Sequence, residues 1–332
     1  MNNCESMNTF HQLFHEQWGH LNDPHVRALA WLLVSPNLLD GSLPELSGRV
    51  AHLSEVQPYR PADVVLWLTQ LDQNPTRLHE AIALHQTNRL GLYAEKLLGF
   101  YFKHIGCLFA NNLQVHGHSN ETLGEFDFLL NQANGLLHLE LATKFYLFDE
   151  HIDADAQANL FDYFGPNLND TLGAKLGKIF NQQLLLGRHE ASLKILTKPV
   201  TKAQALVKGW LFYHAVTNDE NLALGISSMH CRGFWWTQSE FEQLNYSNGL
   251  ILERLSWLAP AQVDADDVVN KSFLSDAIAR RFQVSETPVL VAIMKRNGNV
   301  MQEFCRGMVV PNRWPDKVRA LREIRARTVL SV

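Results

Sequence analysis

The amino-acid sequence predicts a mixed α/β fold, because the spacing of its apolar residues changes from a helical to a strand period part-way along the chain. From Asp23 to about Ile105 the apolar residues recur at helical spacing, whereas from Leu123 onward they alternate with polar residues as in a half-buried strand. The dipeptides Asn134-Gly135 and Asn297-Gly298 each separate two alternating runs and favour tight hairpin turns. With 332 residues, 46% of them hydrophobic, the chain can bury a large core and carry appended subdomains.

Residues 1–88 are expected to form a helical N-terminal region. The dipeptides Ser35-Pro36, Gln57-Pro58 and Asn74-Pro75 interrupt the helical pattern and divide it into four or more helices, the last at residues 89–105. This last helix leads directly into strand-like sequence. We therefore take it as the first helix of a core at residues 89–215.

The expected core combines strands with one further helix. Strands are predicted at residues 113–116, around Phe126 and Phe128, and at residues 139–147, the last two joined by the Asn134-Gly135 turn. A helix is predicted at residues 170–186, where Asp170 or the residue before it can cap the first turn. A strand at residues 208–214 completes the core.

Residues 216–332 are expected to form a C-terminal α+β region. Strands are predicted at residues 225–229, 233–236, 250–257, 289–295 and 300–309, and a helix at residues 273–282. A terminal helix carries five basic residues: Lys317, Arg319, Arg322, Arg325 and Arg327. Such a helix is more typical of a solvated face than of a nucleic-acid contact, but its shortage of acidic residues leaves that contact open as an alternative.

Net charge and cysteine content restrict the classes of partner and compartment. The formal net charge is −5, so a nucleic-acid partner would need a local basic surface. The four cysteines include no CxxC pair, which predicts unpaired thiols and a reduced compartment, the cytoplasm. The chain starts with no signal-peptide pattern and has no apolar run long enough to span a bilayer, so we expect no membrane partner.

The predicted hairpin brings together four charged side chains, those of Glu125, Asp127, Glu140 and Lys144. If Asn134-Gly135 forms the two-residue turn, Asp127 faces Ala142 and Glu125 faces Lys144 across the strands. Two carboxylates so placed can hold a hard cation such as Mg²⁺ or Mn²⁺, with Lys144 orienting a water molecule or stabilising charge beside it. The same pattern also fits a solvated strand face with an ion pair between Glu125 and Lys144, so spacing alone leaves both interpretations open.

Two neighbouring helices add further polar residues to this region. Glu95, on the helix at residues 89–105, is a candidate third carboxylate, or else it pairs with a nearby lysine on the helix surface. On the helix at residues 170–186, Lys175, Lys178 and Gln182 form one polar stripe opposite the apolar positions. Such a stripe usually faces water, but it can also contact phosphate groups.

The order of these motifs resembles the core of the PD-(D/E)XK nuclease superfamily. The resemblance rests on an early helix with Glu95, then Gly124-Glu125-Phe126-Asp127, then HLELATKFY at residues 138–146, then a helix with Lys175 and Gln182. More narrowly, four stretches resemble an uncharacterised bacterial family, domain of unknown function 1853: residues 141–147, Gly165-Pro166-Asn167, residues 208–213 and residues 257–260.

Membership of the superfamily implies a restriction-endonuclease-like αβββαβ core that cleaves phosphodiester bonds with Mg²⁺. It implies Asp127 and Glu140 as metal ligands and Lys144 as the catalytic lysine; Glu95 is then an outer metal ligand and Gln182 a supporting residue. The sequence departs from the usual pattern at Ala142, which stands where the acid two residues before the lysine is expected, so that role passes to Glu140. The resulting hypothesis is a Mg²⁺-dependent phosphodiesterase acting on nucleic acid. The alternative, favoured by the alanine, is a nuclease-like module that binds nucleic acid or a protein without cleavage.

Overall fold

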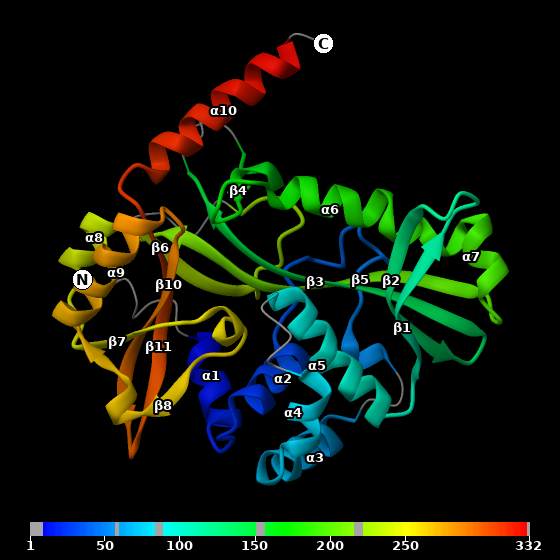
Figure 1. The fold of residues 1–332 in the computed structure, drawn as a ribbon, viewed down its shortest axis with the longest axis horizontal. Helices are drawn as coiled ribbons and strands as arrows, with labels where there is room; N and C mark the ends of the chain where they lie inside the picture. The colour runs from blue at the N-terminus through cyan, green and yellow to red at the C-terminus, as the bar shows by residue number, and fades with distance from the viewer. Residues whose placement is uncertain (1–8, 57–59, 84–88, 151–156, 216–221, 331–332) are drawn as a thin grey trace.

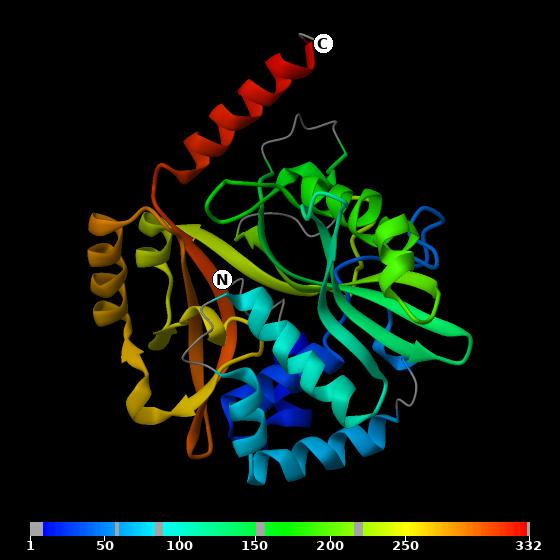
Figure 2. The same cartoon turned by 45° about the vertical axis from the view of Figure 1, so that its right-hand side comes forward.

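The structure is a computed structural model that describes residues 9–56, 60–83, 89–150, 157–215 and 222–330, with side chains described as far as residue 324. A large mixed sheet crosses the molecule, with helices on both of its faces (Figures 1 and 2). The predicted mixed α/β class is therefore confirmed. Within the described ranges, no helix is long and apolar enough to cross a membrane.

Eleven strands belong to this sheet in the described part of the chain. The main order is β1-β2-β3-β5-β6-β11-β10-β7-β9, while β4 pairs with β3 and β8 pairs with β11. The strands are β1 (Leu108–His116), β2 (Thr122–Gln132), β3 (Gly135–Phe148), β4 (Tyr163–Phe164), β5 (Val200–His214), β6 (Cys231–Thr237), β7 (Asn248–Ile251), β8 (Gln262–Asp264), β9 (Val269–Asn270), β10 (Val289–Asn297) and β11 (Val300–Val310).

Five α-helices precede the first strand in the described part of the chain, and the last of them is the predicted first helix of the core. They are α1 (Thr9–Trp18), α2 (Pro24–Val34), α3 (Pro61–Gln73), α4 (Thr76–Ile82) and α5 (Leu90–His104). The later helices are α6 (Leu172–Asn181), α7 (Glu190–Ile195), α8 (Gln238–Gln243), α9 (Lys271–Val284) and α10 (Trp314–Leu330). Figure 1 shows α5 and α6 on opposite faces of the sheet, and α10 extending away from the body of the molecule.

The middle of the chain follows the order helix, three antiparallel strands, helix and parallel strand. The strand pairs β1–β2 and β2–β3 are antiparallel, and after α6 the chain returns as β5, parallel to β3. The sheet then continues, because β6 pairs in parallel with β5 and β11 in parallel with β6. The C-terminal strands are thus part of the same sheet as the predicted core.

Each face of the sheet buries its own apolar cluster. On one face the N-terminal helices place Trp31 and Leu97 against Trp210 of β5. On the other face α6 places Leu176 against Tyr146 of β3. Because side chains alternate along a strand, the even-numbered residues of β3 point to the α6 side and the odd-numbered ones to the N-terminal helices.

Several predicted elements have different bounds in the structure; the strand predicted at residues 208–214, for example, begins at Val200. The strand predicted at residues 225–229 is reduced to one bridge between Ile226 and Leu39, and β7 ends at Ile251 before a short 3₁₀ turn. The helix predicted at residues 170–186 ends at Asn181, and a 3₁₀ segment, η5 (Gln183–Arg188), follows. The α-helix ends here because Leu184 and Leu186 are buried in different clusters. In an α-helix these two side chains would point in nearly opposite directions, so they could not both lie on one buried face.

The register predicted for the hairpin is wrong by two residues. Gln132 pairs with Gly135, so the turn consists of Ala133 and Asn134, and Asp127 lies next to Glu140 rather than opposite Ala142. Gly135 is the first residue of β3, with φ of 141°, and a Cβ there would lie 2.6 Å from the carbonyl oxygen of Pro199. The glycine is therefore required by the close approach of a neighbouring segment and not by the turn.

The cysteines differ in part from the sequence expectation. Cys107 and Cys231 are free and buried. Cys305 is disulfide-bonded, so the prediction of four unpaired thiols is wrong at this position. The absence of a CxxC pair excludes only disulfides that are close in sequence, because bonding between distant cysteines depends on the fold.

Candidate functional site

The strands β2 and β3 separate half-way along the hairpin. They are paired from Gln132 and Gly135 as far as Phe128 and Leu139. Beyond these residues β2 stays paired with β1, and β3 stays paired with β5. This separation, the fork, has Asp127 on its β2 side and Glu140 with Leu141 on its β3 side. The fork brings together two of the predicted acids, and it does so by a break in strand pairing that the sequence pattern did not show.

Asp127 and Glu140 replace the missing strand pairing with side-chain hydrogen bonds. The backbone N–H of Leu141 donates to Oδ2 of Asp127 at 2.8 Å. The backbone N–H of Asp127 in turn lowers the pKa of the Glu140 carboxylate. Polar groups of the two strands therefore act on the acids across the fork, and the bond from Leu141 fixes the carboxylate of Asp127.

Glu140 is almost completely buried, with 1% of its surface exposed, and is held by two further side chains. His138 Nε2 lies 2.6 Å from Oε1, and Gln183 Nε2 donates to Oε2 at 2.7 Å. His138 is itself fully buried, its Nδ1 has no hydrogen-bond partner among the described residues, and burial lowers its pKa to about 4. The imidazole is thus neutral at neutral pH, and Glu140 has no cationic partner in direct contact.

Burial and like charge raise the pKa of both acids at the fork. For Asp127 burial is the larger cause, followed by the charges of Glu140 and Glu95, and the bond from Leu141 opposes them only in part. Burial is also the main cause for Glu140. A buried group of acids with raised pKa values disfavours its own ionised state, and such groups are concentrated at functional sites.

Glu95 and Glu125 meet on the β1 side of the fork. The side-chain amide of Asn112 donates to Glu95 at 3.1 Å and to Glu125 at 3.2 Å, and Gln114 donates to Glu125 at 3.1 Å. Asn112 has a positive φ of 49°, a conformation that asparagine tolerates better than most residues. The predicted pairing of Glu125 with Lys144 is wrong, because Glu125 faces β1 instead.

Lys144 lines a pocket of about 490 Å³ beside the fork. The lining includes four basic and two acidic residues: Arg89, Lys144, Lys175, Arg254, Glu95 and Asp170. Lys175 pairs with Asp170 at 3.3 Å, whereas the other three basic residues make no ion pair within the described ranges. The first turn of α5 also lines the pocket, and no side chain caps this helix end, so its partial positive charge adds to that of the basic residues.

Two features of the surroundings fix Lys144. Burial lowers the pKa of its amine, and the charge of Lys175 lowers it further. On β5, Gly209 faces Lys144 with φ of 151°, and a Cβ at Gly209 would lie 1.7 Å from the carbonyl oxygen of Lys144. Only glycine therefore allows β5 to approach β3 at this position.

The predicted helical stripe reaches this region only in part. Lys175 lines the pocket, but Lys178 and Gln182 are exposed, and it is Gln183 that contacts Glu140. No periodicity could have identified Gln183, because the α-helix has already given way to η5. His138 could have been found, since it lies two residues before Glu140 and so shares its strand face.

Only some carboxylate oxygens at the fork could act as ligands of a metal ion. Within the described residues, no three His, Cys, Asp or Glu side chains form a ready-made metal site. Both oxygens of Glu140 already accept hydrogen bonds, but Asp127 and Glu95 each keep one oxygen without such a bond. Because Mg²⁺ takes oxygen ligands and usually keeps several waters, Asp127 is the best direct ligand, with Glu95 and Glu140 farther out.

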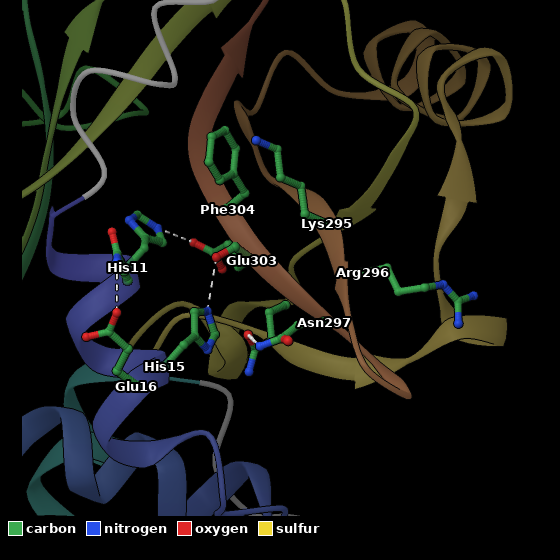
Figure 3. A pocket seen from close by; sticks show the side chains of 10 residues that line it. His11, His15, Glu16, Lys295, Arg296, Asn297, Glu303 and Phe304 are labelled. Carbon is green, nitrogen blue, oxygen red and sulfur yellow. Dashed lines mark hydrogen bonds and ion pairs between the residues drawn. The ribbon is translucent and has the colours of Figure 1, made fainter.

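A second buried glutamate, Glu303 on β11, has the opposite surroundings. Arg306 Nη2 donates to Oε2 at 2.9 Å, the Ala261 N–H donates to the same oxygen at 2.8 Å, and His11 Nε2 lies 2.8 Å from Oε1. Figure 3 shows His11 and His15 of α1 both directed at Glu303, in a pocket of about 340 Å³. Burial alone would raise the pKa of Glu303, but the charge of Arg306 and the bond from His11 hold it well below the usual range. This cluster joins α1 to β11.

Comparison with known families decides the family of the chain. The model described as Domain of unknown function (DUF1853) matches residues 27–310. The chain belongs to the DUF1853 family. Its matched region contains every residue of the fork and the pocket beside it. No curated protein and no solved structure matches the chain.

Proposed function

We propose that this DUF1853 protein is a metal-dependent phosphodiesterase that acts on nucleic acid at the fork. The observation that carries the proposal is the contact between two opposite environments: buried acids with raised pKa values on one side, and on the other a pocket with three basic groups that make no ion pair among the described residues. The acids suit a divalent cation, and the pocket suits a phosphate group. Lys144 lies between them, since Asp127 and Asp170 both influence its pKa.

The order of elements supports the proposal. The sequence α5-β1-β2-β3-α6-β5, with β5 parallel to β3, follows the αβββαβ order of the PD-(D/E)XK nucleases that the motifs resemble. Asp127 lies on β2 and Glu140 and Lys144 on β3, as in that core. Ala142 is buried against the apolar cluster below α6, where an acid would have no partner. Glu140, one step earlier on the same strand face, is therefore the acid of this site.

The roles of the residues follow from their contacts. Bound Mg²⁺ would neutralise the acids and polarise the phosphate oxygens. Asp127 would hold the ion, while His138 and Gln183 keep the carboxylate of Glu140 in one orientation. Lys144, with its pKa lowered by burial, would stabilise charge on the phosphate or accept a proton from an attacking water molecule. Arg89 and Arg254 would bind the phosphate from the far side of the pocket.

The alternative function is binding without cleavage, and one observation favours it. Both oxygens of Glu140 are occupied by neutral donors from the chain itself. If the acids are protonated at neutral pH, the fork needs no metal, and the pocket would bind a phosphate without cutting it. The two functions share the pocket and differ in whether the fork binds a metal.

Cleavage of labelled single-stranded and double-stranded DNA and RNA, with Mg²⁺ or Mn²⁺, separates the two functions. We expect cutting by the full-length protein that is abolished by Asp127→Asn and by Lys144→Ala. The matched controls are Glu242→Gln and Lys194→Ala, both exposed and in the lining of neither the fork nor the pocket beside it. Cutting that persists in both site variants, or no cutting of any substrate, would reject the enzyme at this fork.

A further inference from the structure

A third pocket, of about 720 Å³, lies along the C-terminal half of α5. It is lined by residues of α4, α5 and β1, and it shares none of them with the pocket beside the fork. Three basic residues, Arg77, Lys96 and Lys103, outnumber the one acidic residue, Glu80. Arg77 and Lys103 are exposed and make no ion pair within the described residues. The local charge is thus positive on a chain whose net charge is −5.

Aromatic rings stand next to these cations. His104 is exposed and stacks on Trp67 with ring centroids 4.4 Å apart and planes 12° apart. Phe100 stacks on the same tryptophan at 6.1 Å, with planes 25° apart. Phe100 and His104 both line the pocket. A flat ring such as a nucleobase can continue a stack of this kind.

This pocket is connected to the fork by hydrogen bonds and by α5 itself. Asn111, in the pocket lining, donates to Asn112 at 2.8 Å, and Asn112 donates to Glu95 at 3.1 Å. From Glu95 to Lys103 the helix rises by about 12 Å. A bound strand could therefore extend from the aromatic rings at the C-terminal end of α5 towards Glu95 at the fork.

We infer that the C-terminal end of α5 binds a single strand of nucleic acid, with bases on Phe100 and His104 and the backbone on Lys103 and Arg77. Where the bound strand would be cut, the inference rests on the proposed function. Cations next to stacking rings are the recognition chemistry of single strands, because every unpaired base offers a flat face. In a duplex these faces are covered by neighbouring bases, so the rings would contribute nothing to its binding.

Binding without cleavage tests the inference directly. The probe is a labelled oligothymidylate of about 10 nucleotides, within the range that one binding groove accommodates, and its anisotropy is measured with the full-length protein in EDTA. We expect His104→Ala to weaken binding at least about fivefold, since loss of one stacked base costs about 1 kcal/mol or more. We expect Lys103→Ala to reduce the salt slope by about 0.7, the value for one phosphate contact on a single strand.

Two exposed residues far from α5 are the matched controls. Arg296→Ala removes a cation from the hairpin between β10 and β11, and Phe273→Ala removes a ring of α9 that is 55% exposed. Both variants should bind as the wild type does. His104 and Lys103 are also exposed, so circular dichroism should show unchanged folding in all four variants.

The outcomes separate this inference from the proposed function. Wild-type binding by His104→Ala and Lys103→Ala, or equal competition by a duplex of the same sequence, would overturn the single-strand site even if the protein cleaves nucleic acid. Oligothymidylate binding that depends on both residues supports the site. Such binding in the absence of any cleavage would reject the enzyme and leave a single-strand binding protein.

Discussion

Glu140 and Glu303 lie in the same sheet, and each has 1% of its surface exposed, yet their carboxyl groups are held in opposite ways. Glu303 has a guanidinium, an imidazole and a backbone N–H as partners, and its pKa is lowered. Glu140 has a neutral imidazole, an amide and a backbone N–H, with other acids nearby, and its pKa is raised. Burial is equal in the two cases, so the difference comes from the charge of the partners.

This difference separates a residue that stabilises the fold from one that does not. A buried carboxylate with a matched cation is tied to its partner, and removal of either leaves an uncompensated charge. A buried carboxyl beside other acids costs stability in its ionised form, and proteins retain such groups where function requires them. The contrast predicts opposite responses to substitution at β11 and at the fork.

The largest effect is expected at β11. Arg306→Met leaves Glu303 buried without its cation, and we expect a loss of about 3–5 kcal/mol in the free energy of unfolding. Urea denaturation measures it. The double variant Arg306→Met with Glu303→Leu should recover part of the loss, because the uncompensated carboxylate is then removed as well, although the buried Arg27 loses the charge of Glu303. A loss below about 1 kcal/mol in the single variant would show that Glu303 is not held by this pair.

At the fork we expect the opposite sign. Asp127→Asn removes a buried carboxyl whose ionisation is disfavoured by burial and by Glu140 and Glu95, and should raise the free energy of unfolding by about 1–2 kcal/mol at pH 7. Thermal unfolding should also show that Mg²⁺ stabilises the wild type but not the variant, because the variant has lost the direct ligand. Destabilisation by this substitution would contradict the raised pKa of Asp127.

The pH dependence of stability sharpens the same comparison. The pKa of Asp127 is higher in the folded state than its usual value of 3.8, so the folded protein binds more protons in this window and its stability falls as pH rises from about 4 towards neutrality. Glu303 acts in reverse: its contribution is present above its usual pKa and is lost as pH falls below it. Unfolding of wild type and Asp127→Asn between pH 4 and pH 8 should show a smaller decline in the variant. Parallel curves would contradict this assignment.

The smallest effect distinguishes two adjacent glutamines. Gln183→Ala removes the amide that holds Glu140 and should cost about 1 kcal/mol in the free energy of unfolding, together with activity at the fork. Gln182→Ala changes an exposed side chain at the end of α6 and should stay within about 0.5 kcal/mol. Equal losses of stability in the two variants would contradict the assignment of the supporting role to Gln183 rather than to Gln182.

The sequence by itself determined the α/β class, the helical beginning of the chain and the existence of the hairpin. These features can be predicted from sequence because the spacing of hydrophobic residues and the choice of turn residues depend on only a few neighbouring positions. The alternation at Phe126 and Phe128, for example, indicates a strand whatever the rest of the fold is. It also identified Asp127, Glu140 and Lys144 as the polar side chains of that hairpin. The resemblance of its motifs to a known family also predicted the family to which the chain belongs.

Only the tertiary structure decided how these residues meet. The register differs because Gly135 is required by the approach of Pro199 and not by the turn, and the strands separate at Asp127 while β2 stays paired with β1 and β3 with β5. Gln183 reaches Glu140 because η5 must bury Leu184 and Leu186 in different clusters. These choices depend on contacts between segments far apart in the chain, and no local pattern records them. The charge of the partners around a buried acid, which separates Glu140 from Glu303, is decided in the same way.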